Sequence, residues 1–492
     1  MFSKVLVANR GEIAFRVINS LQEHGVSAAL LVSPIDKNTL PAKQADTIIE
    51  LPGDLPSESY LDQDLIINLA KEECIDAIHP GYGFLSENVE FRKKIDKAKI
   101  AYIGPTASNM EILGDKIQAR QAAIDSGTPL LPGTVSSMDI GDLKEEAMNI
   151  GYPILIKAAA GGGGRGIRLV KSEKEFDSQA DNAIAEAKMA FGDGRIYIEK
   201  YLTSGKHIEV QILGDGRGEV LHFFERDCSI QRKNQKLIEE GPAPSISREK
   251  ASEIHSTAIG LTSYLKYLNA GTVEFMLDSK GNHYFLEVNT RIQVEHPVTE
   301  MITGEDLVWR QIQVAAGEDL NISQSDICYR GHAMEARIYA ENPFRDFIPS
   351  TGTIQRISHP VGPGIRVDSH MVDNTSIPPF YDSMIAKLIA YGTDRDQSIS
   401  RLNRALKSYQ IRGIQTTIPY IRQILVLDDF KQCNYDTGYL QSHQSTFTIP
   451  KHLQTIAVAA ASREFQVSGS AEMNEKVNIG SPWKRSLFPK VM

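Results

Sequence analysis

Two patterns of apolar positions alternate along the first hundred residues. Val5–Ala8 and Val26–Val32 are unbroken apolar runs, typical of strands covered on both faces. Between them, Glu12 to Leu21 has the spacing of an amphipathic helix, and Gly25 is a common helix terminator. The pattern predicts a strand, a helix and a second strand in that order.

The alternation continues to about residue 103. A helix is predicted after Ser59, with Asp62 close to a capping-box position. Short strands at Ile75–Ile78 and Ala101–Ile103 flank a charged helix over Glu87–Lys97. Strands that alternate with helices in this way predict a parallel, doubly wound sheet.

A glycine cluster lies in a second unit, from about residue 113 to residue 201. Gly161–Gly166 follows a predicted strand, Pro153–Ala158, and leads into another, Ile167–Val170. A dinucleotide fingerprint would open a helix instead, so a nicotinamide oxidoreductase is disfavoured. A glycine loop between two strands can bring bare N–H groups close to phosphates, and Lys157 supplies a cation beside it. The alternative is a long surface turn.

Two acidic residues are predicted to face each other across a hairpin. The segments 271–277 and 283–289 flank a turn centred near Lys280, and this register pairs Glu274 with Glu287. Asn289 lies two residues further along the same face. Two facing carboxylates call for a cation, and oxygen-only ligands suit Mg²⁺ shared with substrate phosphates. The alternative is an exposed hairpin whose acids point to water.

The second strand of this hairpin is predicted to continue to Pro297. A period of two then places Arg291, Gln293 and Glu295 on the face of Glu287. Polar and apolar residues also alternate in an ordinary half-buried strand, which is the alternative explanation. The mixture of an acid, an amide and a guanidinium beside a metal candidate can bind a small oxyanion and also supply a base.

Charge, hydrophobicity and cysteine spacing disfavour several classes of protein. The 53 basic and 62 acidic residues give a net charge of −9, which argues against a nucleic-acid binder. The apolar runs are too short to span a bilayer. The strand pattern starts directly after Met1–Lys4, which we expect to leave no room for a targeting peptide. Four separated cysteines indicate free buried thiols rather than zinc or disulfides. We therefore expect a cytoplasmic protein without a membrane partner.

Several segments together resemble biotin carboxylase, an ATP-grasp enzyme, over about residues 2–445. They are Val7–Ala14, His79–Asn88, the glycine loop, Glu199–Leu202, Glu225–Arg232, Glu287–Glu300 and Tyr381–Met384. The resemblance implies an α/β protein with the ATP-grasp fold: an N-terminal doubly wound parallel-sheet domain, a mobile glycine-loop lid and a mixed α+β C-terminal domain. The expected borders are 1–113 for the N-terminal domain, 114–203 for the linker helix and lid, 204–446 for the core and C-terminal domain, and 447–492 for a tail.

The resemblance also implies a role for each matching position. ATP would contact Lys116, Lys157, Gly163, Gly164, Glu199, Lys200, Leu202, His207, Gln231, Asn234, Glu274 and Glu287. Mg²⁺, or Mn²⁺ in its place, would be held by Glu274, Glu287 and Asn289. Bicarbonate would bind Lys236, Arg291, Gln293 and the Val294 backbone. Glu295 would be the catalytic base, with Arg291 and Lys236 beside it, and Arg337 would bind biotin.

The chain departs from the family pattern at two positions. Many members carry His where this chain has Asn234, which can hydrogen-bond but not carry a charge. Pro363 replaces an aromatic residue expected at the family's dimer contact, although Arg16, Glu23 and Arg366 are present. A homodimer remains the expected assembly.

The implied reaction is ATP- and bicarbonate-dependent carboxylation of biotin through carboxyphosphate. Biotin would arrive on a separate biotin carboxyl carrier protein, because no lysine here has methionine on both sides. A carboxyltransferase subunit would then pass the carboxyl group to acetyl-CoA, propionyl-CoA, another acyl-CoA, pyruvate or urea. Other ATP-grasp ligases that join a carboxylate to an amine, and a non-catalytic binding subunit, are the alternatives.

The last 46 residues, 447–492, extend beyond the matched region. They hold one short apolar stretch, Ile456–Ala461, and then an isolated Trp483 among basic residues. We expect a docking or linker segment in which Trp483 serves as an anchor. A tail without a partner is the alternative.

Overall fold

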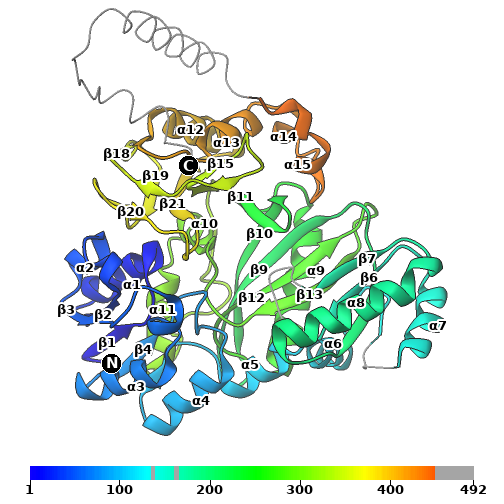
Figure 1. Ribbon diagram of the computed structural model, residues 1–492, viewed down its shortest axis with the longest axis horizontal. Helices are drawn as coiled ribbons and strands as arrows, with labels where there is room; N and C mark the ends of the chain where they lie inside the picture. Colours follow the sequence, from blue (N-terminus) through cyan, green and yellow to red (C-terminus); the bar gives the residue numbers. More distant parts are fainter. Residues whose placement is uncertain (135–138, 160–165, 449–492) are drawn as a thin grey trace, which may run out of the picture.

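The N-terminal domain is a parallel sheet covered by helices. The computed structural model describes residues 1–134, 139–159 and 166–448. The five strands have the order β3-β2-β1-β4-β5, all parallel, which confirms the doubly wound sheet (Figure 1). The strands are β1 (Lys4–Val7), β2 (Ser27–Val32), β3 (Thr47–Glu50), β4 (Ala77–His79) and β5 (Ala101–Tyr102). The helices are α1 (Gly11–Glu23), η1 (Pro34–Asp36), α2 (Leu40–Gln44), η2 (Pro56–Glu58), α3 (Gln63–Glu72), α4 (Val89–Ala98) and α5 (Ala107–Gly114).

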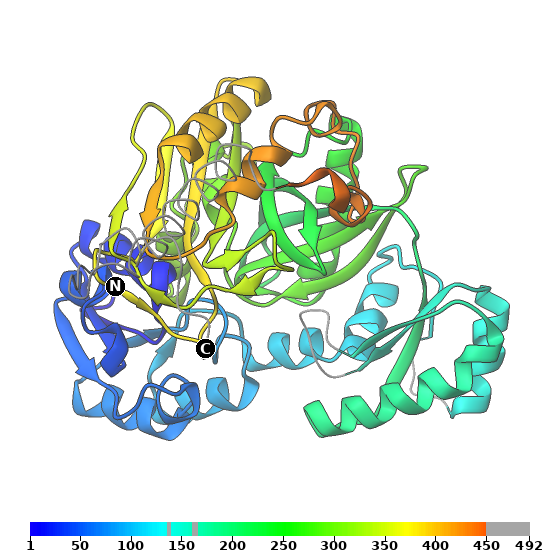
Figure 2. The ribbon, with the colours of Figure 1, turned by 45° about the horizontal axis from the view of Figure 1, so that its top comes forward.

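A three-stranded sheet with two helices forms the lid unit, which lies beside the central sheet (Figure 2). Its strands have the antiparallel order β7-β6-β8. The glycine cluster therefore connects two antiparallel strands, as predicted. The elements are α6 (Lys116–Asp125), which leads into the unit, α7 (Ile140–Ile150), β6 (Ile154–Ala158), β7 (Ile167–Val170), α8 (Glu173–Phe191) and β8 (Ile196–Lys200).

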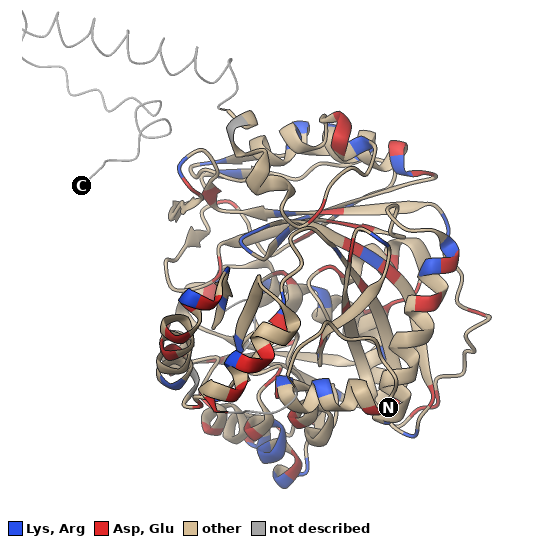
Figure 3. Cartoon of the chain, turned by 90° about the vertical axis from the view of Figure 1, so that its right-hand side faces the viewer, with Lys and Arg blue, Asp and Glu red and all other residues tan. Residues whose placement is uncertain are grey.

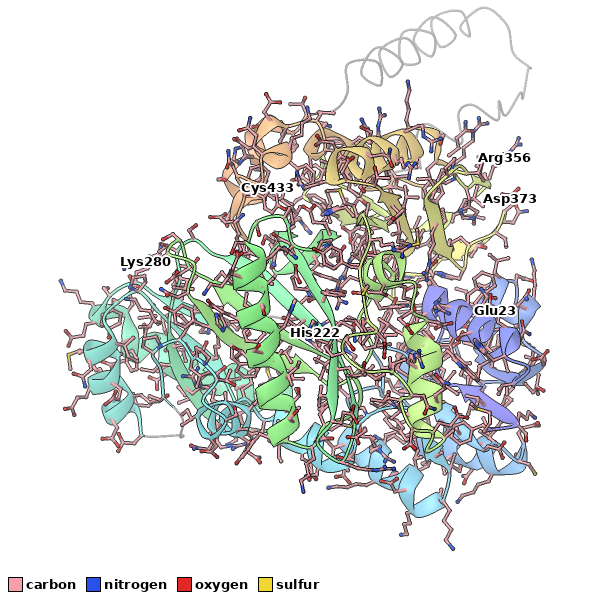
Figure 4. All side chains as sticks on the ribbon, turned by 180° about the vertical axis from the view of Figure 1, so that it is seen from behind. Glu23, His222, Lys280, Arg356, Asp373 and Cys433 are labelled. Carbon is pink, nitrogen blue, oxygen red and sulfur yellow. The ribbon has the colours of Figure 1, made fainter. Side chains whose placement is uncertain are left out.

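An eight-stranded antiparallel sheet runs through the middle of the molecule, in the order β13-β12-β9-β10-β11-β14-β21-β19. Its hairpin between β12 and β13 turns at Lys280 (Figure 4). The strands are β9 (Lys206–Asp215), β10 (Val220–Arg232), β11 (Gln235–Gly241), β12 (Leu268–Leu277), β13 (His283–Asn289), β14 (His332–Tyr339), β19 (Ile365–Ser369) and β21 (Met384–Gly392). Helices α9 (Arg248–Tyr264), α10 (His296–Thr303) and α11 (Leu307–Ala315) pack against it.

The C-terminal part adds helices and short strand pairs to one end of this sheet. The helices are α12 (Arg395–Ser408), α13 (Ile418–Ile424), α14 (Asp428–Lys431), α15 (Tyr439–Ser442) and η3 (Gln444–Thr446). The strand pairs are β15 (Glu341–Asn342) with β16 (Ile348–Pro349), β17 (Gly352–Thr353) with β20 (Ser376–Ile377), and β18 (Arg356–Ser358) with β22 (Gln410–Arg412). Positive and negative residues are interspersed over the surface helices (Figure 3).

The described chain continues into the segment expected to be the tail. Phe447 is buried in the C-terminal core and its ring lies 4.4 Å from that of Tyr420. The backbone N–H of Thr448 donates to the side-chain oxygen of Gln423, and the side-chain NH₂ of Gln423 donates to the Thr448 carbonyl. Phe447, the first residue of the segment expected to be the tail, therefore packs in the C-terminal core, and Trp483 lies outside the described residues.

Two local expectations from the sequence are wrong. The helix expected after Ser59 begins at Gln63, and its cap is Asp62, whose carboxylate accepts from the Leu65 amide. Of the four cysteines, only Cys228 is buried; Cys433 is half-buried, and the other two are exposed. No helix in the described ranges combines the length and apolar character that crossing a membrane requires.

Candidate active site

A row of charged residues crosses four neighbouring strands of the central sheet. Glu287 of β13 is opposite Glu274 of β12, as the sequence predicts, and Glu274 is opposite Glu209 of β9. Glu209 is in turn opposite Arg226 of β10, whose Nε donates to its carboxylate at 2.6 Å. The predicted carboxylate pair is thus part of a longer row, and like charges in adjacent positions destabilise a sheet unless cations compensate them.

Lys236 provides that compensation from β11. Its Nζ lies 2.5 Å from Glu209, 3.0 Å from Glu274 and 2.6 Å from Glu295. It also donates to the side-chain oxygen of Gln293 at 3.2 Å. One ammonium group therefore gathers residues from β9, β12 and the segment after β13 around a single point.

Burial and neighbouring charges shift the pKa values of Lys236 and Glu295 in opposite directions. Burial alone would lower the pKa of Lys236, but the carboxylates of Glu209, Glu274 and Glu295 raise it well above its usual value. Burial alone would raise the pKa of Glu295, but Lys236, Arg337 and Arg226 hold it well below its usual value. Both groups are therefore charged at neutral pH.

The segment that carries Glu295 is a bend, not a strand. β13 ends at Asn289, and α10 begins at His296 with Pro297 in its first turn, where proline is well tolerated. The predicted continuation of the strand to Pro297 is therefore wrong. Polar residues alternate with apolar ones in residues 291–295 because the polar side chains point into the site, and not because the segment is a strand with a side-chain period of two.

The bend nevertheless brings the predicted side chains together. Asn289 and Gln293 both donate to one oxygen of Glu274, at 2.9 and 3.0 Å. Arg291 donates to the Asn289 oxygen at 3.0 Å and is paired with Glu87 at 3.2 Å. The amide groups thus connect the row of carboxylates to the guanidinium group.

Arg337 of β14 lies between two carboxylates. Its Nη2 donates to Glu295 at 2.8 Å, and its Nε donates to Glu239 of β11. Burial raises the pKa of Glu239 to about 7, although Arg337 opposes this effect. The guanidinium plane is therefore fixed at two of its nitrogen atoms, with Glu295 on one side.

The residues expected at the nucleotide form a second group nearer to the lid. Lys116 lies 3.3 Å from Glu287, and Lys157 is paired with Glu199. His207 donates from Nε2 to Glu274 at 3.0 Å when that nitrogen is protonated. Gln231 bonds to the other ring nitrogen of His207 at 3.1 Å.

Within the described residues, the side chains of three further nucleotide candidates form no hydrogen bond or ion pair with these groups. Lys200 donates to the carbonyl groups of Gly151 and Tyr152, at 2.7 and 3.3 Å. Leu202 is half-buried in the segment after β8. Asn234 is exposed in the turn between β10 and β11, with a positive φ of 65° that Asn tolerates well. Gly163 and Gly164 lie outside the described residues.

Several site residues were missed by sequence reasoning. They are Glu87, Arg120, Glu209, Arg226 and Glu239; Arg120 is paired with Glu199. A usable signal existed for Glu209, because His207, Glu209 and Gln211 alternate along one strand with apolar residues between them. The others are single charges whose partners lie far away in the sequence.

Two overlapping sets of described residues have the spacing of a cation site. Ligand atoms of His207, Glu209 and Glu274 lie within 4.8 Å of one another, as do those of Glu209, Cys228 and Glu295. Both oxygens of Glu209 already accept from Arg226 and Lys236. Glu274 is engaged as well, because Lys236, Asn289 and Gln293 donate to one of its oxygens and His207 faces the other. A cation held between Glu274 and the facing Glu287 would therefore take the place of some of these contacts.

Three family models match consecutive parts of the chain. The biotin carboxylase N-terminal domain matches residues 1–110, the ATP-binding domain of the carbamoyl-phosphate synthase L chain matches 115–323, and the biotin carboxylase C-terminal domain matches 335–442. Together they span most of the chain.

Named relatives and solved structures agree with these models. A pyruvate carboxylase subunit of Methanothermobacter thermautotrophicus is 47% identical over 445 residues, 90% of each chain. Biotin carboxylase of Nostoc is 45% identical over 89% of this chain and 99% of its own length. The biotin carboxylase domain dimer of Hydrogenobacter thermophilus 2-oxoglutarate carboxylase, a complex with MgADP, ADP and bicarbonate, has a TM-score of 0.89 at 45% identity, over 92% of this chain and 99% of that one.

The fold and the site define an ATP-dependent ligase of the ATP-grasp class. Within that class, the chain belongs to the biotin carboxylase family. The resemblance found in the sequence and the fold expected from it are confirmed.

Proposed function

We propose that this chain uses ATP and bicarbonate to carboxylate biotin on a separate carrier protein, and that Lys236, Arg337 and Glu295 form the centre of the site. The observation that carries the proposal is the contact of Glu295 with both cations, at 2.6 and 2.8 Å. A carboxylate in that position is a base beside two groups that attract an anion. The reaction is the first half of an acyl-CoA carboxylase or pyruvate carboxylase cycle.

Bicarbonate binds where Lys236 and Arg291 can share its negative charge, with Gln293 and the Val294 backbone completing the donors. Lys236, which lowers the pKa of Glu295, also attracts the negative charge that develops on bicarbonate when it loses its proton. Glu295 removes the proton, and the bicarbonate oxygen then attacks the γ-phosphorus of ATP. ADP leaves, and carboxyphosphate forms.

ATP lies between the lid and the central sheet. Lys116 and Lys157 contact its phosphates, together with Gly163 and Gly164. Glu199, Lys200 and Leu202 form the hinge at adenine; Lys200 supports it by holding β8 to the start of β6. His207, Gln231 and the neutral Asn234 contact the nucleotide. Each of these contacts positions charge or orients the phosphate for transfer.

The donor set at the hairpin fits Mg²⁺, with Mn²⁺ as a substitute. Glu274 and Glu287 are opposite each other in the sheet, and the Asn289 side chain donates to Glu274, so its oxygen lies nearby. Oxygen ligands combined with substrate phosphates suit a small hard cation. When bound, the ion neutralises charge on the phosphate oxygens.

Carboxyphosphate then breaks down to CO₂ and phosphate beside biotin. The phosphate takes the ureido proton of biotin, and Arg337 stabilises the enolate-like oxygen that results. Hydrogen bonds to Glu239 and Glu295 already fix the orientation of its planar guanidinium group. Closeness of CO₂ to biotin can contribute roughly 7–11 kcal/mol to such a step.

Biotin arrives on a biotin carboxyl carrier protein, and a carboxyltransferase subunit completes the cycle. The sequence that most resembles a biotin attachment site, Lys188-Met189, lies in α8 and not in a turn. Relatives are named as subunits of pyruvate and 2-oxoglutarate carboxylases. The final acceptor, whether acetyl-CoA, propionyl-CoA, pyruvate or another, is not specified by these residues.

A homodimer is the proposed assembly, since a related structure is described as a dimer. Arg16 and Arg366 both bind Glu300 within this chain, at 2.8 and 2.7 Å, whereas Glu23 is exposed (Figure 4). Sedimentation of the purified chain tests this assembly. The cytoplasmic location and the domain borders expected from the sequence stay predictions.

Release of ADP and phosphate tests the proposed function. ATP cleavage should need bicarbonate and should produce carboxybiotin when biotinylated carrier is added. Cleavage that instead requires an amine acceptor, with no response to bicarbonate, would identify a different ATP-grasp ligase.

A further inference from the structure

Lys387 is a fully buried lysine that joins three parts of the molecule. It lies on β21 and its side chain is 0% exposed. Its Nζ is 3.0 Å from the carboxylate of Glu12 in α1 and 3.9 Å from that of Asp368 in β19. It also donates to the main-chain carbonyl of Val294 at 2.9 Å. The N-terminal domain, the central sheet and the bend after β13 therefore meet at one ammonium group.

Stability alone does not explain this cation. Burying an ion costs several kcal/mol, and replacing a buried ion pair with apolar residues is often neutral or stabilising. Burial would lower the pKa of Lys387, but Glu12, Glu335 and Asp368 outweigh it and raise the pKa above its usual value. Neighbouring acidic groups, of which Glu12 is the nearest, thus keep the lysine charged inside the protein.

The hydrogen bond from Lys387 is accepted by the Val294 carbonyl, which lies in the bend that carries Glu295. Residues 290–295 form neither strand nor helix, so their shape depends on contacts with other elements. Val294 lies between Gln293 and Glu295, and both of those side chains contact Lys236. A rotation of the Val294 peptide would displace both side chains from the point where they meet.

We propose that Lys387 is a positioning residue for bicarbonate, because it holds the Val294 carbonyl and so fixes the bend that carries Gln293 and Glu295. This inference rests on the proposed function, in which those residues meet bicarbonate. Glu12 supplies the compensating charge, and it is itself bonded by the Tyr82 hydroxyl. The role differs from catalysis, since Lys387 touches no substrate.

A pair of substitutions separates positioning from folding. Lys387→Met alone leaves Glu12 buried without its partner, which destabilises the protein. The double variant Lys387→Met/Glu12→Gln removes both charges and should recover most of that stability. It cannot hold the Val294 carbonyl, so its KM for bicarbonate in ATP cleavage should rise about tenfold or more, while the KM for ATP changes little.

Two single variants serve as controls. Glu12→Gln keeps the bond from Lys387 to Val294 and should keep a bicarbonate KM close to that of the wild type. Lys206→Met removes another lysine that donates to a carbonyl, that of Cys433 at 2.9 Å, and should leave the bicarbonate KM unchanged. Lack of bicarbonate-dependent cleavage in the wild type would instead count against the proposed function itself.

Three results would overturn the inference. They are a folded double variant with the wild-type bicarbonate KM, an equal rise in both KM values, and a rise in Glu12→Gln as large as that in the double variant. Should the double variant fail to fold, Lys387→Gln/Glu12→Gln keeps an amide donor and is compared with Glu12→Gln alone. Its weaker neutral bond should raise the bicarbonate KM by about threefold or more, and an unchanged value would overturn the inference.

Discussion

The ammonium group of Lys236 lies 2.6 Å from the carboxylate of Glu295, whose side chain is fully buried, whereas that of Lys236 is 12% exposed. A bicarbonate ion that binds to Lys236 must therefore enter beside the group proposed to deprotonate it. The contact places the cation that binds bicarbonate and the base that deprotonates it within reach of each other before any substrate arrives. It also means that bicarbonate competes with Glu295 for the same cation.

Glu295→Gln should retain ATP binding and lose bicarbonate-dependent ATP cleavage by about 10²–10⁴-fold. The amide has the same shape, but its single oxygen can accept from Lys236 or from Arg337 and not from both, and it cannot take a proton at neutral pH. Steady-state phosphate release and nucleotide binding by calorimetry measure the two effects separately. Glu253→Gln, on the exposed face of α9, is the matched control. Wild-type turnover in Glu295→Gln would remove Glu295 as the base.

Arg337→Lys should lower biotin carboxylation roughly tenfold more than it lowers ATP cleavage. Arg337 uses two different nitrogen atoms for Glu239 and Glu295, and a lysine has only one to offer. The comparison needs phosphate release and carboxybiotin formation measured in the same preparation. An equal loss in both would show that Arg337 acts earlier, on ATP or bicarbonate.

Glu240→Gln should reduce stability in a pH-dependent way. Burial would raise the pKa of Glu240, but hydrogen bonding from His332 and the charge of Arg395 lower it from 4.5 to about 2. A lowered carboxylate pKa stabilises the folded state above pH 4.5, by about 3 kcal/mol here, and this contribution is lost as the pH falls toward 2. Denaturant unfolding should give a wild-type advantage that is about 1 kcal/mol smaller at pH 4 than at pH 7. The same advantage at both pH values would contradict this account.

Two truncations test where the folded core ends. A chain that ends at Thr448 keeps Phe447 in its place against Tyr420 and should unfold like the full chain. A chain that ends at Thr446 loses that ring and should be less stable by ~1.5–3 kcal/mol. Both should retain activity on free biotin, and weaker association with the partner subunits would support the docking role expected for residues 447–492. Equal stability of the two truncations would show that Phe447 contributes nothing.

The sequence allowed prediction of structure wherever a local pattern determines it. The register that pairs Glu274 with Glu287 follows from the length of one turn, and it is confirmed. The position of the glycine loop between two strands follows from the β pattern after Gly166, and it too is confirmed. The error at residues 290–297 has a physical cause, since polar residues that converge on a site can imitate the alternation of a strand.

Contacts between distant segments could not be predicted in this way. Lys387 is the charged residue of an otherwise apolar strand, β21, whereas Glu239 lies in a strand with several other polar residues. Their partners are far away in the sequence: Arg337, 98 positions from Glu239, and Glu12, more than 300 positions from Lys387. Their burial becomes evident only when β11, β14 and β21 lie side by side in one sheet. For Lys387, a charge inside an apolar strand was the available signal, and it indicates a buried partner without identifying it.

The fate of the bicarbonate oxygens tests the central claim most directly. If a bicarbonate oxygen attacks the γ-phosphorus of ATP, that oxygen stays with the phosphate when carboxyphosphate breaks down. We therefore expect that phosphate released in the presence of ¹⁸O-labelled bicarbonate carries one labelled oxygen per turnover, as measured by mass spectrometry soon after mixing. Phosphate that carries oxygen only from water would contradict the formation of carboxyphosphate and the role assigned to this site.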